Sequence, residues 1–121
     1  MPVRSLRSSV LVWPRLPDVD RAARAWAARQ ADAHPETLAV GYFGSYARRD
    51  DGPGSDLDLV LIVAASDGPF TERAAKWDLR GLPVPADLLV YTADEWRRLQ
   101  REGGRFAQVL AAETVWLLGA P

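Results

Sequence analysis

Three aspartates and a glycine–serine pair are the residues whose types and spacing suit chemistry. Asp56 and Asp58 stand two residues apart at the start of an apolar run, and Asp87 lies inside a second apolar run. Residues two apart in a strand point to the same face, about 6.6 Å from each other. Asp56 and Asp58 therefore project together, and a neighbouring strand that turns Asp87 to the same face would bring three carboxylates into one place.

A cluster of three carboxylates requires a cation. At an effective dielectric of about 20, two such charges about 6 Å apart repel by roughly 3 kcal/mol. The chain has no cysteine and one histidine, which excludes thiolate and multi-histidine sites. Ligands that are all oxygen suit Mg²⁺ or Mn²⁺. The sequence thus predicts that Asp56, Asp58 and Asp87 hold one or two such ions, which can activate an attacking oxygen and stabilise a leaving phosphate.

Gly44 and Ser45 follow directly after a predicted strand and supply features that a phosphate needs. Glycine lets the backbone approach a ligand closely. Backbone amides at the start of the following turn, together with the Ser45 hydroxyl, can hold phosphate oxygens. Arg48 comes one helical turn later and can contact the same phosphates with two nitrogens.

Structural explanations for these residues remain open at this point. With 11 aspartates in 121 residues, about one Asp-x-Asp pair is expected by chance, and the chain has two. We assign the other pair, Asp18 and Asp20, to a helix start, where acidic residues complement the helix dipole. Asp87 would be structural if an arginine paired with it.

The hydrophobic pattern predicts alternating strands and helices in an α/β or α+β domain. Proline, glycine and capping residues mark the boundaries, including a capping box formed by Thr92 and Glu95. The expected strands are Ser9–Trp13, Thr37–Phe43, Asp56–Ala64 and Val84–Tyr91, and the expected helical segments are Asp18–Ala33, Gly44–Arg49, Thr71–Leu79, one from Thr92 to about Gly103 and one around Phe106–Leu110, with Thr114–Leu118 left as a helix end or a short strand.

Length and composition indicate one globular domain over residues 1–121. Apolar residues make up 48% of the chain, and the net charge is -1. A near-neutral chain argues against nucleic acid as a direct partner. No apolar stretch approaches the roughly 20 residues that span a bilayer, so we expect no membrane contact and a cytoplasmic protein.

The segments Gly44–Arg48 and Ser55–Leu59 closely resemble the signature of the DNA polymerase β-like nucleotidyltransferase superfamily. Within it, the chain resembles the minimal nucleotidyltransferases, small proteins often paired with HEPN-domain partners as antitoxins. The motif-bearing part covers residues 38–91. In one departure from the pattern, Arg49 stands where a glycine usually follows the arginine, which leaves the shape of the loop open.

The resemblance implies a mixed β-sheet flanked by helices and transfer of a nucleoside monophosphate from an NTP, such as ATP, to a hydroxyl acceptor. By the match, Gly44 and Ser45 bind the triphosphate and Asp56 and Asp58 bind both metals. Asp87 binds the catalytic metal and helps to deprotonate the acceptor.

Three functions stay open on the sequence alone. The first is an active transferase, whose acceptor is a partner protein or whose site is completed by a homo-oligomer. The second is an antitoxin that masks a HEPN-domain toxin, with little or no catalysis. The third is an antibiotic-modifying transferase, which would carry an extra helical domain that the sequence does not show.

Two other groups of residues favour structural interpretations. The five tryptophans are spread along the chain and indicate core or partner-facing apolar mass. Arg97, Arg98, Arg101 and Arg105 form a basic run, for which a solvated helix face is the simpler explanation than contact with phosphate or RNA.

Overall fold

A computed structural model of the chain describes residues 13–121. The predicted strand Ser9–Trp13 lies outside the described residues, apart from Trp13, which belongs to no strand. The described elements are α1 (Leu16–Ala33), β1 (Thr37–Phe43), α2 (Ser45–Arg48), β2 (Leu57–Val63), α3 (Phe70–Arg73), the 3₁₀ helix η2 (Ala74–Lys76), β3 (Ala86–Thr92), α4 (Ala93–Glu102), α5 (Arg105–Glu113) and β4 (Val115–Leu118).

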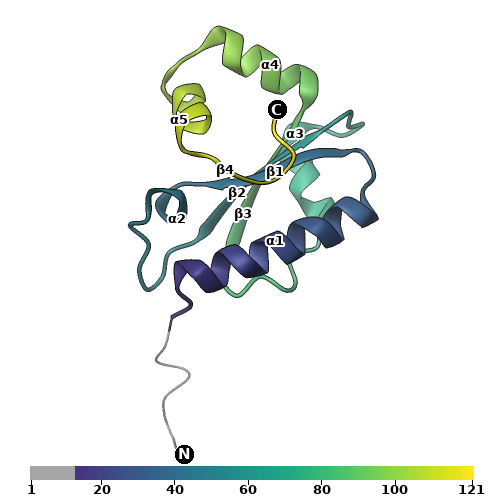
Figure 1. Cartoon of the computed structure of the whole chain (residues 1–121). Coiled ribbons are helices and arrows are strands. Elements are labelled where there is room, and N and C mark those ends of the chain that lie inside the picture. The colour runs from purple at the N-terminus through teal and green to yellow at the C-terminus, as the bar shows by residue number, and fades with distance from the viewer. Residues whose placement is uncertain (1–12) are drawn as a thin grey trace, which may run out of the picture.

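The four strands form one mixed sheet in the order β3-β2-β1-β4. β1 pairs antiparallel with both β2 and β4, whereas β2 and β3 run parallel. Helix α1 lies along one face of the sheet, and α4 and α5 lie on the other (Figure 1). The predicted mixed sheet flanked by helices is therefore confirmed as an α+β fold.

Strand β2 is buried on both faces, and its alternation decides which face the acids take. Leu57, Leu59 and Leu61 belong to the core under α1, while Val60 and Ile62 belong to a second core with Trp96 of α4 and Leu110 of α5. Successive side chains of a strand point to opposite faces. Asp58 therefore shares the α4–α5 face with Val60 and Ile62.

The core on the α1 side is held by the largest buried side chain, Trp26. It is fully buried, and its Nε1 donates to the Asp78 carbonyl at 2.6 Å. Burying an indole of this size contributes about 3 kcal/mol, and the hydrogen bond avoids the cost of an unpaired buried N–H group. The loop that carries Asp78 is thereby attached to α1 beneath the sheet.

Several predicted boundaries shift, each for a local reason. Helix α1 begins at Leu16 rather than at Asp18, because Pro17 in the first turn has its backbone angle preset for a helix. The predicted helix Thr71–Leu79 is shorter and divides into α3 and η2. The undecided segment Thr114–Leu118 becomes β4, because its backbone pairs with β1.

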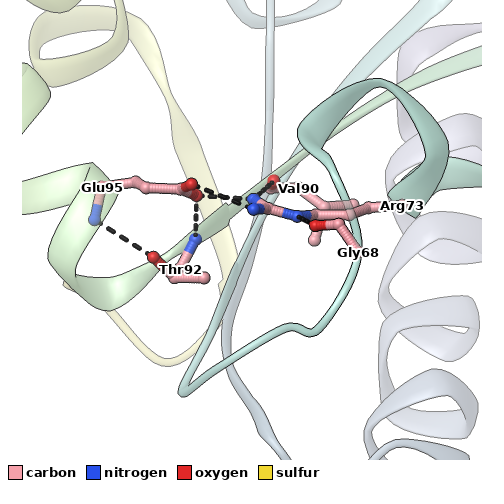
Figure 2. Close-up of polar contacts among 5 residues, drawn as sticks. All are labelled: Gly68, Arg73, Val90, Thr92 and Glu95. Atoms are coloured by element: carbon pink, nitrogen blue, oxygen red, sulfur yellow. Dashed lines mark hydrogen bonds and ion pairs between the residues drawn. The ribbon is translucent and has the colours of Figure 1, made fainter.

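The start of α4 carries the capping box that the sequence predicts. The Thr92 hydroxyl accepts from the Glu95 amide, and the Glu95 carboxylate accepts from the Thr92 amide. The same carboxylate also pairs with Arg73 from α3 (Figure 2). Glu95 therefore connects three elements: the end of β3, the start of α4, and α3.

None of the helices in residues 13–121 has the length and apolar character needed to cross a bilayer. The Arg97, Arg98, Arg101 and Arg105 run is exposed, as expected of a solvated helix face. Trp26, Trp77 and Trp96 are buried, which confirms them as core residues.

Candidate active site

The parallel pairing of β2 and β3 brings two of the predicted acids side by side. Asp58 and Asp87 are direct partners in the register, each second in its strand. The Leu57 amide donates to the Pro85 carbonyl at 2.8 Å, which fixes this register from its first residue. Directly paired residues share one face of a sheet, so both carboxylates lie on the α4–α5 face.

Asp56 lies one residue before β2 and is exposed, as is Asp87, whereas Asp58 is half-buried. Burial, then the nearby charges of Asp87 and Asp56, raise the pKa of Asp58 above its usual value. Arg48 opposes this shift of the pKa. The charges of Asp87 and Asp56 therefore act on Asp58, which is the least exposed of the three acids.

No cation among the described residues pairs with Asp56, Asp58 or Asp87. An arginine partner would have made Asp87 a structural residue, and among residues 13–121 there is none. Like charges left together in a folded protein cost stability unless a ligand compensates for them. The arrangement is therefore typical of a site that receives a cation.

Gly44 lies against Asp58 so closely that no side chain fits at its position. It caps α2 with a φ of 80°, a region that L side chains rarely adopt. A Cβ at this position would collide with the Asp58 Oδ2 atom. Gly44 is therefore required both by the turn and by the close approach of the backbone to the carboxylate.

Ser45 opens the short helix α2, which Arg48 closes. The Arg48 guanidinium pairs with Asp50 at 3.2 Å and with Glu113 at 3.4 Å, and about half of its side chain is exposed. The predicted phosphate contact would require Arg48 to leave these exposed pairs, which stabilise the protein little because water screens them.

Arg49, which replaces the usual glycine, takes the left-handed backbone conformation with a φ of 64°. This is the region that glycine favours, so the position keeps the glycine geometry with a larger side chain. Tyr46, in the same turn, is fully buried and anchors the loop to the core. Its hydroxyl accepts a hydrogen bond from Trp13 Nε1 at 3.2 Å. The departure therefore leaves the turn intact.

Sequence reasoning did not single out two aromatic residues beside the acids. Phe43 is the cross-strand partner of Asp58, and Phe106 of α5 meets the Phe43 ring edge-on at 5.9 Å. The sequence could have indicated Phe43, because it stands immediately before Gly44 of the predicted phosphate-binding pair. Phe106 had no such signal beyond its place in an apolar segment, since its approach to Phe43 spans 63 residues.

The sequence matches one protein family over most of its length. Residues 27–109 match the family of nucleotidyltransferase domains. The chain belongs to this nucleotidyltransferase family. No curated protein matches the sequence significantly.

Solved structures agree on the fold of this nucleotidyltransferase domain. A Sulfolobus solfataricus protein inferred to be a nucleotidyltransferase superposes with a TM-score of 0.60 at 20% identity, covering 84% of this chain and 80% of its own. A toxin–antitoxin structure with AMP-PNP gives 0.52 at 17% identity, and a mutant of the toxin–antitoxin MntA–HpeT gives 0.50 at 15%. Each covers 80% of this chain and 73% of its own. At these identities the likeness concerns the fold.

The donor set of the nucleotidyltransferase domain suits a divalent ion of the Mg²⁺ type. Its acids offer only oxygen, two of them in register, with a third two residues away. As they stand, no three His, Cys, Asp or Glu side chains of residues 13–121 converge closely enough to hold a metal. Carboxylates that repel one another lie apart, and a bound cation would draw them together. The residue types and the β2–β3 register therefore fit the ion.

Proposed function

We propose that this chain transfers a nucleoside monophosphate from ATP or another NTP to a hydroxyl acceptor, with divalent metal ions held by Asp56, Asp58 and Asp87. The observation that carries the proposal is the pairing of Asp58 with Asp87 in the parallel β2–β3 register, with no cation against either in the described residues. A structural role for the pair would call for a partner charge. A catalytic role calls for the uncompensated negative charge that is present.

Gly44 and Ser45 supply the binding site for the triphosphate in this proposal. They lie at the start of α2, and Gly44 is directly beside Asp58, which supports binding of the phosphates next to the acids. Backbone amides at the turn and the Ser45 hydroxyl donate to phosphate oxygens. Arg48 reaches the same phosphates once it leaves Asp50 and Glu113, exchanging two exposed ion pairs for a stronger charge-assisted pair.

The reaction forms one bond and breaks one bond at the α-phosphorus. The acceptor oxygen attacks, the bond between the α-phosphorus and the bridging oxygen breaks, and pyrophosphate leaves with that oxygen. Asp87, which is exposed and thus open to an acceptor, takes the hydroxyl proton. Divalent ions, when bound, would supply the positive charge that stabilises the attacking and leaving oxygens.

We propose a hydroxyl on a partner protein as the acceptor. Asp56 and Asp87 are both exposed to solvent. An open face of this kind suits a large acceptor that brings its own surface. Two of the similar folds are toxin–antitoxin proteins, which supports a partner of that kind, including a HEPN-domain protein.

The test is transfer of label from ATP labelled at the α-phosphate, in a lysate supplemented with Mg²⁺. We expect a labelled protein band with the wild-type chain, no band with EDTA, and at least a 100-fold lower rate in Asp58→Asn and Asp87→Asn. Asp67→Asn is the matched control, because Asp67 is an exposed acid of a loop beyond the other end of β2. It should transfer at the wild-type rate.

Label transfer that survives both substitutions would reject the proposal. An absence of label, with a partner that still co-purifies with the Asp58→Asn and Asp87→Asn variants, would instead favour the masking function of an antitoxin.

A further inference from the structure

We propose that the ring of Phe106, which Phe43 holds in place, forms an aromatic platform on which the base of the nucleotide stacks. The inference rests on the proposed function, because it assigns the nucleoside part of the same site. It begins from the row of residues that crosses the sheet at the level of the acids.

In this row Asp58 lies in the middle. Phe43 flanks it on β1, and Asp87 flanks it on β3. The register pairs Asp87 with Asp58 and Asp58 with Phe43, across the neighbouring strands β3, β2 and β1. All three side chains share the α4–α5 face, because directly paired residues do so. The acceptor that gives its proton to Asp87 approaches from the β3 side. The β1 side, where Gly44 also begins the phosphate turn, is left for the nucleotide.

Phe106 is more exposed than its place in α5 requires. Ala107 and Leu110 of the same helix are buried and fix α5 on the sheet, while 43% of the Phe106 side chain is exposed. Its ring meets Phe43 edge-on, with the ring planes at 77°. This contact holds the ring in place and leaves its surface open to a ligand.

An exposed phenylalanine alone carries no functional meaning, because isolated apolar residues are common on protein surfaces. What distinguishes Phe106 is its contact with the direct neighbour of Asp58. Bases stack on aromatic side chains whatever their sequence identity, because each base has a π face. The platform therefore predicts binding of a nucleoside with little choice among bases.

The test separates the nucleoside from the phosphates by comparing two ligands. Binding of Mg-AMP-PNP and of Mg-tripolyphosphate is titrated calorimetrically in the wild-type chain and in Phe106→Ala. We expect Phe106→Ala to weaken AMP-PNP binding about ten-fold or more and to leave tripolyphosphate binding unchanged. Phe106→Trp should bind AMP-PNP at least as well as the wild type.

Phe70→Ala is the matched control. Phe70 is also a partly exposed phenylalanine in a short helix, at 38%, and it contacts Tyr91 at 5.1 Å between ring centres, far from the acids along β3. It should leave both affinities unchanged.

Two results would overturn the platform. If Phe106→Ala binds AMP-PNP as the wild type does, or weakens both ligands equally, the platform is wrong while the proposed transferase stands. If the wild-type chain binds neither ligand, the platform and the proposed function fall together.

Discussion

The two ends of strand β3 carry charge in opposite ways. At its start, Asp87 lies beside Asp58 with no cation against either among residues 13–121. At its end, the Arg73 guanidinium is buried, pairs with both oxygens of Glu95 and donates to the carbonyls of Gly68 and Val90 (Figure 2). One end leaves negative charge uncompensated, and the other satisfies a buried cation with several acceptors.

The difference separates an end of β3 that stabilises the fold from an end that costs the fold stability. Glu95 closes the cap of α4 and pairs with Arg73. Removing Glu95 leaves the buried Arg73 charge unpaired, and removing Arg73 leaves the partly buried Glu95 carboxylate without its cation. Asp58 gains nothing from Asp87 in the folded protein, since the two raise each other's energy. A fold retains such a pair at a cost in stability, as is typical of active sites.

The largest expected effect is at the stabilising end. Arg73→Met should lower the free energy of unfolding by about 3–5 kcal/mol, because the partly buried Glu95 carboxylate loses its cation and the Gly68 and Val90 carbonyls lose their donor. Urea unfolding followed by circular dichroism measures this. Arg80→Met is the control: the exposed Arg80 guanidinium also pairs with an aspartate, Asp78, and its loss should leave the free energy of unfolding nearly unchanged. Equal effects of the two substitutions would remove the distinction.

The turn beside the acids ranks second. Gly44→Ala should cost about 2–3 kcal/mol, from the positive φ and from the collision with Asp58. Gly54→Ala isolates the first cause, because Gly54 has a φ of 88° and open space around it, and it should cost about 1 kcal/mol. Thermal unfolding of the two variants gives the difference. A Gly54→Ala cost as large as that of Gly44→Ala would show that the acid does not touch this turn.

The pH dependence of stability tests the Arg73–Glu95 pair. The guanidinium of Arg73 lowers the pKa of Glu95 to about 2, from 4.5. A depressed acid pKa contributes stability that is complete above pH 4.5 and is lost as the pH falls toward 2. Because Glu95 is partly exposed, we expect the pair to account for about 1–2 kcal/mol of the stability that the wild type loses at acid pH. Glu95→Gln should lack this part of the pH dependence.

Urea unfolding at several pH values between 7 and 2 measures this slope. Glu102→Gln, at an exposed acid in the last turn of the same helix, should retain the wild-type slope. A wild-type slope in Glu95→Gln as well would show that the pair does not carry the acid sensitivity.

The smallest expected effect has the opposite sign. Asp58→Asn removes a charge that Asp87 and Asp56 repel, so it should raise the free energy of unfolding by up to about 1 kcal/mol. Differential scanning calorimetry in a metal-free buffer detects the gain as a higher Tm. A clear loss of stability would mean that Asp58 holds the fold together, like the residues at the other end of β3.

Short-range sequence patterns predicted many of the helices and strands. The Thr92–Glu95 capping box and the apolar run through β2 fixed their elements, because both depend on neighbouring residues. The sequence placed Asp56 and Asp58 on one face by the same local rule. The expectation that a neighbouring strand would bring Asp87 to that face required pairing across the chain, and the β2–β3 register provides it for Asp58.

Contacts between distant residues were beyond local rules. The sequence did not predict that Arg73 is buried. Its partner Glu95 lies 22 residues away, and the capping box alone accounted for a glutamate at that position. Arg48, which the sequence predicts to contact the phosphates, also pairs with Glu113 across 65 residues. Such contacts depend on which helices the sheet brings together, and a single sequence does not contain that information in its periodicity.

Binding of Mn²⁺ tests the central claim most directly, because Mn²⁺ can occupy Mg²⁺ sites and its electron paramagnetic resonance signal reports the free ion. Titrations in the presence of AMP-PNP should show bound Mn²⁺ in the wild-type chain and in Asp67→Asn. The same titrations should show at least a ten-fold weaker affinity in Asp58→Asn and in Asp87→Asn. An unchanged affinity in a variant carrying both substitutions would contradict the account, because Asp58 and Asp87 would then have no part in holding the ion.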